Sequence, residues 1–118
     1  NGGGEMKVSG KNMTMTRGDS EVITIECFLE DRTEMPFLEG DIVYFTVKET
    51  IHDEEKVLQK VITEFTDGKA IIYIEPEDTK SLLFKTYVYD VQLTRAEGTV
   101  TTIIPPSNFT IGGEVTYD

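Results

Sequence analysis

The acidic side chains are the residues of this chain best suited by type to bind a metal or to hydrolyse a substrate. They gather at 30–34, 53–55 and 75–78. Calcium needs about six to eight oxygen ligands converging from a shaped loop, and none of these groups has the Asp-x-Asp-x-Asp-Gly spacing of such a loop. Glycoside hydrolysis needs two facing carboxyl groups, one with a raised pKa, and the pattern indicates no such pair. We interpret the clusters as solvated loop tips.

Nucleophilic catalysis has no better support. The single histidine, His52, stands beside Asp53 in a polar loop, and no Gly-x-Ser-x-Gly segment occurs. The N-terminal glycines do not follow a strand, so they do not form a phosphate-binding loop. The single cysteine, Cys27, alternates with Ile25 on an expected strand, which is the position of a small buried thiol. We therefore expect a protein that is not an enzyme and that binds no metal or other cofactor.

The tripeptide Arg17-Gly18-Asp19 is a sequence that integrins bind on exposed loops. Here it stands between two alternating apolar runs, where glycine relieves backbone strain and aspartate accepts hydrogen bonds from nearby amides. Three residues match easily by chance, so we interpret the tripeptide as a structural turn.

Length and charge limit the class of protein. With 118 residues there is room for one core, and we expect a single domain at 11–118 after a flexible segment or expression remnant at 1–10. Eleven basic and 22 acidic residues give a net charge of −11, which repels phosphate backbones and anionic lipids. We therefore expect no nucleic acid and no membrane among its partners. No apolar run approaches the ~20 residues that cross a bilayer, and no signal peptide is visible.

Apolar and polar side chains alternate over short segments bounded by turn residues, which is typical of β-strands. We expect about seven to eight antiparallel strands, at 13–15, 23–29, 43–47, 57–65, 70–74, 87–93, 99–104 and 108–111. Asp67-Gly68 and Glu97-Gly98 are two-residue hairpin signals. Pro105 and Pro106 should interrupt the final strand and place it at a sheet edge or a bulge.

The alternation also predicts which side chains face the core. For most strands the inward residues are Ile23, Ile25, Cys27, Leu29, Val43, Phe45, Val47, Ala70, Ile72, Ile74, Tyr87, Tyr89, Val91 and Leu93. For the segment 57–65 we expect Val57, Val61 and Phe65 on one face. In the connection before Gly40, Phe37 and Leu38 should act as apolar anchors.

The segment from Pro76 to Leu93 favours one architecture. Proline ends a strand at 76, residues 77–79 can cap a single helical turn, and residues 82–84 would supply its buried side. This places a short helical turn near 77–84, before the strand that starts with Tyr87. Immunoglobulin-like sandwiches carry the chain between sheets in this way, often with a tyrosine at the corner. We therefore predict an all-β, immunoglobulin-like β-sandwich, with an open barrel as the alternative.

Three apolar side chains are expected to face outward. Ile42, Tyr44 and Tyr73 have the opposite parity from the inward rows of their strands. Exposed aromatic side chains serve partner interfaces and sugar-binding platforms alike. We take Ile42, Tyr44 and Tyr73 as the candidate partner-contact surface.

The order of the motifs resembles a family of small phage domains. It runs Arg-Gly-Asp-Ser, Leu-Glu-Gly-Asp-Ile-Val-Tyr-Phe-Thr-Val-Lys (38–48), an acidic loop, Asp-Gly, Pro-Glu-Asp-Thr, Tyr-x-Tyr-Asp-Val-Gln-Leu, and Gly-Thr-Val-Thr-Thr-Ile-Ile-Pro-Pro-Ser-Asn-Phe-Thr-Ile (98–111). Over roughly residues 13–116 the chain is similar to the immunoglobulin-like N-terminal domains of baseplate upper proteins and related tail-region proteins. These belong to phages and prophages of Gram-positive bacteria.

The resemblance implies a structural role without catalytic residues. It implies a virion component, made in the bacterial cytoplasm, that joins other tail or baseplate proteins or further copies of itself as a homo-oligomer. The alternative is a carbohydrate-binding or adhesive module of a bacterial surface protein. Such a module would use exposed aromatic side chains or calcium-ordered loops, and the sequence leaves weak calcium or sugar binding open.

Overall fold

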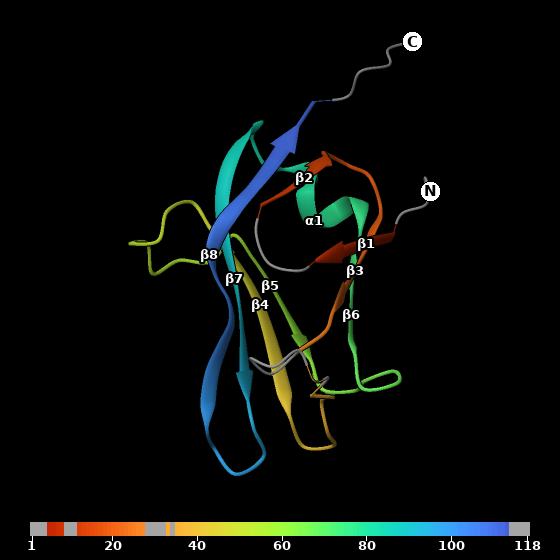
Figure 1. Ribbon diagram of the computed structural model, residues 1–118. Coiled ribbons are helices and arrows are strands. Elements are labelled where there is room, and N and C mark those ends of the chain that lie inside the picture. The colour runs from red at the N-terminus through yellow and green to blue at the C-terminus, as the bar shows by residue number, and fades with distance from the viewer. Residues whose placement is uncertain (1–4, 9–11, 28–32, 34, 114–118) are drawn as a thin grey trace.

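The computed structural model describes residues 5–8, 12–27, 33 and 35–113, which contain eight strands and one short helix (Figure 1). The elements in chain order are β1 (Glu5–Val8), β2 (Met13–Thr16), β3 (Glu21–Ile25), β4 (Ile42–Lys48), β5 (Leu58–Ile62), β6 (Ala70–Ile74), α1 (Pro76–Lys80), β7 (Lys85–Thr94) and β8 (Val100–Gly112). The prediction of an all-β chain with one short helical turn is confirmed. The helix lies at 76–80, slightly earlier than expected.

The strands form two sheets. The larger has the order β2-β8-β7-β4-β5, and the smaller has the order β1-β3-β6 (Figure 1). Pairing is antiparallel except between β1 and β3 and between β2 and β8, which are parallel. The expectation of antiparallel strands is therefore wrong for these two pairs. A hairpin enforces antiparallel pairing only between consecutive strands, and neither parallel pair is joined by one.

Both sheets contribute side chains to one apolar core. Along β4 the side chains alternate between buried and half-buried, as predicted for 43–47. The small sheet buries Ile23 and Ile25 completely. The predicted inward faces of β3, β4, β6 and β7 are confirmed, including the burial of Cys27, while Leu29 lies outside the described residues.

Three aromatic rings meet in this core. The ring centroids of Phe45 and Tyr89 are 5.5 Å apart, and Phe109 lies 6.1 Å from the first and 6.2 Å from the second. Tilted and edge-on ring pairs of this kind contribute about 0.5–1.5 kcal/mol each beyond the area they bury. Burial raises the pKa of Tyr89 to about 12. The prediction that Tyr87 and Tyr89 belong to the core is confirmed.

Val57 and Phe65 pack against the core, but strand β5 between them turns Val61, expected on the same face, away from it. Its register places Val61 opposite Tyr44, and Val61 is 49% exposed. Leu58 and Ile62 pack against the core instead. The segment 57–65 carries apolar residues of both parities, so alternation alone did not select a face, and pairing with β4 decides it.

Of the two residues expected to anchor the connection before β4 by apolar packing, only one does so. Phe37 is buried, and its ring centroid lies 5.2 Å from that of Phe65. Leu38 is 60% exposed, so its predicted anchoring is wrong. Its backbone N–H donates to Asp41 Oδ2 at 2.8 Å, and Asp41 N–H donates to the carbonyl of Leu38. This tight turn leaves the leucine side chain in solvent.

The Asp67-Gly68 turn forms as predicted but joins different sheets. Both residues have a positive φ, 54° and 75°, and reciprocal backbone hydrogen bonds of 2.9 Å between Thr66 and Lys69 close the turn. The chain then passes from β5 in the large sheet to β6 in the small one. A Cβ atom at Gly68 would lie 2.5 Å from Pro36 Cβ, so this position requires glycine for space as well as for φ.

Strand β8 continues through Pro105 and Pro106, so the expected interruption is wrong. Its register against β7 shifts between Tyr89 and Gln92, and the two prolines lie opposite this irregular stretch. On its other side, β2 pairs only with 109–112. The prolines therefore stand on a bulged edge, where a missing N–H costs no ladder bond.

A tyrosine fixes the corner between α1 and β7. The backbone N–H of Leu83 donates to Tyr87 Oη at 2.9 Å. Leu82 packs against the core, but Leu83 and Phe84 are 64% and 54% exposed, so their predicted burial is wrong. The helix has ended before them, and the ring of Phe84 lies instead against the guanidinium of Arg17, 4.1 Å from its centroid.

Candidate functional site

The side chains suited to catalysis do not converge. Among the described residues, no group of three or more His, Cys, Asp or Glu side chains is placed to hold a metal. His52 is exposed in the loop that follows β4. Burial raises the pKa of the Cys27 thiol, and the positive charge of Arg95 offsets only part of that rise. Cys27 therefore carries little thiolate at neutral pH.

The acidic residues around α1 have structural roles. The backbone N–H of Glu75 donates to Asp78 Oδ2 at 2.7 Å, which caps the start of the helix. Lys60 Nζ of β5 lies 2.8 Å from the same oxygen and joins the helix to the large sheet. Burial raises the pKa of Asp78, but the hydrogen bonds from Lys60 and Glu75 outweigh it, so the pKa lies below its ordinary value.

The Arg17-Gly18-Asp19 segment is a turn bound to the α1 corner. Arg17 Nη1 donates to the carbonyl of Leu82 at 3.2 Å, and the backbone N–H of Gly18 donates to Thr79 Oγ1 at 2.8 Å. Gly18 has a φ of 87°. These contacts support the structural interpretation of the tripeptide, because the guanidinium already has partners inside the chain.

Ile42 and Tyr44 lie side by side on the outer face of the large sheet. Tyr44 is opposite Val61 of β5 on one side and Gln92 of β7 on the other, and Gln92 is opposite Thr102 of β8. Residues opposite one another across strands share a face, so these four make one row. At about 4.8 Å between strands, the row is about 14 Å long.

A second row runs beside the first. Ile42 is opposite Thr94 of β7, which is opposite Val100 of β8. Val100 is 59% exposed, and Ile42 and Tyr44 are half-buried. Six residues of the two rows supply most of this surface. We call them the outer-face patch: Ile42, Tyr44, Val61, Gln92, Val100 and Thr102.

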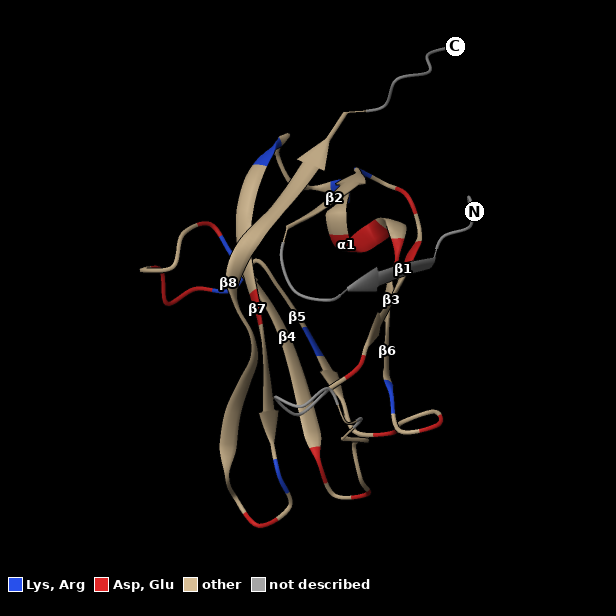
Figure 2. Cartoon of the chain, viewed as in Figure 1, with Lys and Arg blue, Asp and Glu red and all other residues tan. Residues whose placement is uncertain are grey.

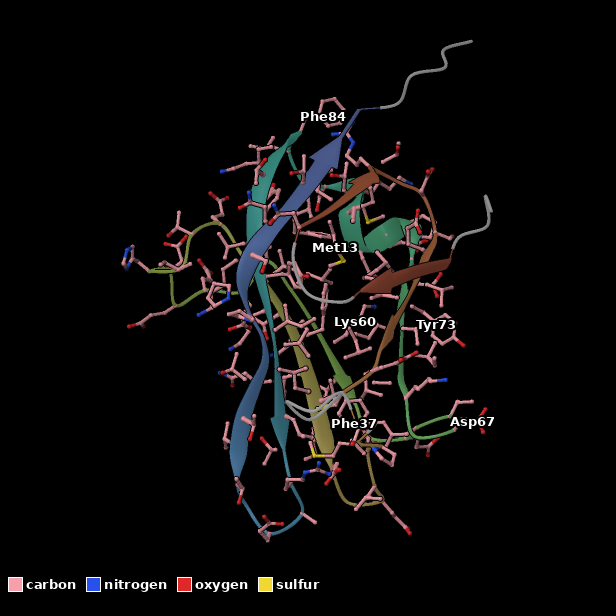
Figure 3. The ribbon with its side chains drawn as sticks, in the orientation of Figure 1. Met13, Phe37, Lys60, Asp67, Tyr73 and Phe84 are labelled. Atoms are coloured by element: carbon pink, nitrogen blue, oxygen red, sulfur yellow. The ribbon has the colours of Figure 1, made fainter. Side chains whose placement is uncertain are left out.

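Tyr73 belongs to a different surface. It lies on β6 of the small sheet, opposite Val22, and is 57% exposed. Figure 3 shows its side chain beside β6, directed away from β4 and β7. The structure thus brings Ile42 and Tyr44 together and separates Tyr73 from both. The sequence interpretation missed the other members of the outer-face patch, because parity does not show which strands are neighbours.

A shallow hollow adjoins the outer-face patch. It has a volume of about 50 Å³ and is lined by Thr46, Lys48, Thr50, Ile51, Val88, Tyr89, Asp90 and Pro106. It lies where the β7–β8 register shifts and where the loop after β4 approaches β8. Burial raises the pKa of Asp90, and the charge of Lys48 offsets part of the rise. The hollow has room for the end of one side chain.

The fold and this surface define a small two-sheet β domain with a broad, nearly uncharged sheet face. The helix in the described part of the chain is too short to span a membrane. No protein-family model matches the chain, and no curated protein matches it in sequence.

Among solved structures, the chain is similar to one described as the N-terminal domain of phage TP901-1 ORF48. The two share 13% sequence identity with a TM-score of 0.50, over 93% of this chain and 94% of that one. At this identity the similarity concerns the fold. It indicates that the two domains share a fold, while the immunoglobulin-like assignment stays a prediction.

Proposed function

We propose that this protein is a non-enzymatic assembly module of a phage or prophage tail or baseplate, acting through protein–protein contacts. The observation that carries the proposal is a fold similarity to a phage domain that extends over nearly the full length of both chains. The motif order from Arg17 to Ile111, which resembles that of small phage tail-region domains, supports the same role.

The surface of the domain fits a contact role better than a catalytic one. Small-molecule sites are clefts of about 300–1,000 Å³ lined by converging polar groups. The hollow beside Asp90 measures about 50 Å³ and combines one carboxylate with one lysine. The outer-face patch, in contrast, is broad and offers aromatic, aliphatic, hydroxyl and amide groups, which suit a protein interface.

The proposal is tested by asking whether the chain is a component of particles. Phage or prophage particles are induced in the bacterium that carries the gene, purified on a density gradient and analysed by mass spectrometry. We expect the chain to sediment with tail or baseplate proteins at a fixed ratio to them. Expression of the chain in the cell together with its absence from intact particles would refute the proposal.

A glycan array run with and without calcium provides the complementary test. We expect no sugar-dependent binding. Selective binding to one glycan, reduced by Tyr44→Ala or by calcium removal, would favour the carbohydrate-binding alternative.

A further inference from the structure

The outer face of the large sheet is poor in charge compared with the rest of the chain. At the outward positions of β4, β5, β7 and β8, Lys48 and Asp90 are the charged residues. Charged residues make up 28% of the whole sequence, so this face departs from the composition around it. Interface centres are depleted in charged residues and enriched in tyrosine, and Tyr44 occupies the middle of this face.

The polar side chains of this face bind one another across the strands. Gln59 Nε2 donates to Thr46 Oγ1 at 2.9 Å, and Gln92 Nε2 lies 3.5 Å from Thr102 Oγ1. These contacts hold long side chains close to the sheet. A partner that docks here meets a surface that is already ordered, which lowers the entropy cost of association.

Acidic residues flank the face at both ends of its strands. The loop after β4 carries the exposed Glu49, Asp53, Glu54 and Glu55, and its residues Thr50 and Ile51 line the hollow with Pro106. At the opposite end, Glu39 precedes β4 and Glu97 lies at the tip of the β7–β8 hairpin. Figure 2 shows acidic residues in these connections and largely uncharged strands between them.

We propose that the outer-face patch docks a different protein of the particle, one whose contact surface is uncharged at its centre and carries Lys or Arg around its edge. This inference rests on the proposed function and names the surface and the chemistry of its partner. The basic edge faces the acidic loops, which provides attraction and orientation, and the neutral centres make the desolvated contact.

Two other modes of association fit the structure less well. A second copy of this chain, with its net charge of −11, would bring acidic loops against acidic loops. Strand addition along β8 meets an irregular register and two prolines beyond the part that β2 covers. Bulges and prolines are devices that prevent edge pairing. The sheet face is therefore favoured over these two modes.

The test compares two exposed tyrosines on different sheets. Tyr44→Asp places a charge at the centre of the outer-face patch, and Tyr73→Asp places the same charge on the small sheet. Each variant replaces the wild-type gene, and particle-associated protein is quantified relative to the cellular pool. We expect at least a tenfold loss for Tyr44→Asp and less than a twofold change for Tyr73→Asp. Val61→Lys, on the adjacent strand, should repeat the loss if Tyr44→Asp reduces folding.

Two further measurements complete the test: one neutralises the acidic loop, and the other determines whether the chain associates with itself. Replacing Asp53, Glu54 and Glu55 by their amides should also reduce incorporation, because the basic edge of the partner loses its counterparts. Sedimentation velocity of the purified chain is expected to show a monomer. A wild-type dimer that dissociates on Tyr44→Asp would overturn the choice of partner.

The outcomes separate this inference from the proposed function. Absence of the wild-type chain from particles would overturn both. Presence of the wild type with equal incorporation of the Tyr44 and Tyr73 variants would overturn the docking surface alone.

Discussion

The ion pair between Asp41 and Arg95 should be the most sensitive polar contact of the domain. Asp41 is 2% exposed, and its Oδ2 accepts hydrogen bonds from Arg95 Nη1 at 2.6 Å and from the backbone N–H of Leu38 at 2.8 Å. The pair joins the turn that enters β4 to the hairpin that connects β7 to β8. It therefore holds together one end of the sheet that carries the outer-face patch.

The substitution Arg95→Met keeps an unbranched apolar stem and removes the charge. It leaves the Asp41 carboxylate buried with one hydrogen bond, a situation that costs about 3–5 kcal/mol. A domain of this length has a total stability of roughly 6–18 kcal/mol, so the loss is a large fraction of it. With a urea m-value of about 1–3 kcal/mol/M, the unfolding midpoint should fall by about 1–5 M.

The measurement is urea unfolding at pH 7 of the wild type, Arg95→Met, Asp41→Ala and the double variant. We expect the double variant to cost less than the sum of the single ones by about 1–3 kcal/mol, because both remove the same interaction. The matched control is Lys85→Met, which breaks the exposed 3.0 Å pair with Glu49 and should leave the midpoint nearly unchanged. Equal midpoints for Arg95→Met and Lys85→Met, or additive single effects, would refute the reasoning.

Three further predictions concern the helix cap, two turns and the buried thiol. Asp78→Asn should destabilise the domain by about 1 kcal/mol at neutral pH. The pKa of Asp78 is lower in the folded than in the unfolded state, so the difference in unfolding free energy between the wild type and Asp78→Asn should disappear as pH falls from about 4 through the folded pKa. Urea unfolding across that pH range measures this difference, and a constant value would contradict the prediction. Gly68→Ala should lower the melting temperature more than Gly98→Ala: both positions have a positive φ, but the second has open space around it, so equal shifts would contradict the steric argument. Cys27 should react with a disulfide reagent only as the protein unfolds in urea, and fast labelling in buffer would contradict its burial.

The sequence was sufficient for elements whose pattern has one solution. In β4, the polar Thr46 and Lys48 mark the outward parity, so the inward Val43, Phe45 and Val47 follow directly. The Asp67-Gly68 turn was equally clear, because positive φ at both residues favours this pair. The pairing of the strands on either side of this turn was not clear, since a turn does not reveal whether the strands it joins share a sheet.

The parts that sequence could not provide depend on register between strands that are distant in the chain. Val61 was expected on the face of Val57 and Phe65, but 57–65 has apolar residues of both parities, and pairing with β4 turns Val61 outward. Pro105 and Pro106 suggested a break, but the irregular β7–β8 register accommodates both within β8. Short N-terminal strands without a hairpin partner carried no signal of parallel pairing.

The same limit explains why the outer-face patch was recognised only in part. Parity alone placed Ile42 and Tyr44 outward, but their neighbours come from three other strands, and each of those strands avoids charge at the relevant positions independently. The core does not require this, because it uses only the inward residues. Solubility would favour charged side chains at these outward positions, particularly in a chain with 28% charged residues. Solubility does not select a neutral surface assembled from four strands, and contact with the partner proposed above is a constraint that would account for it.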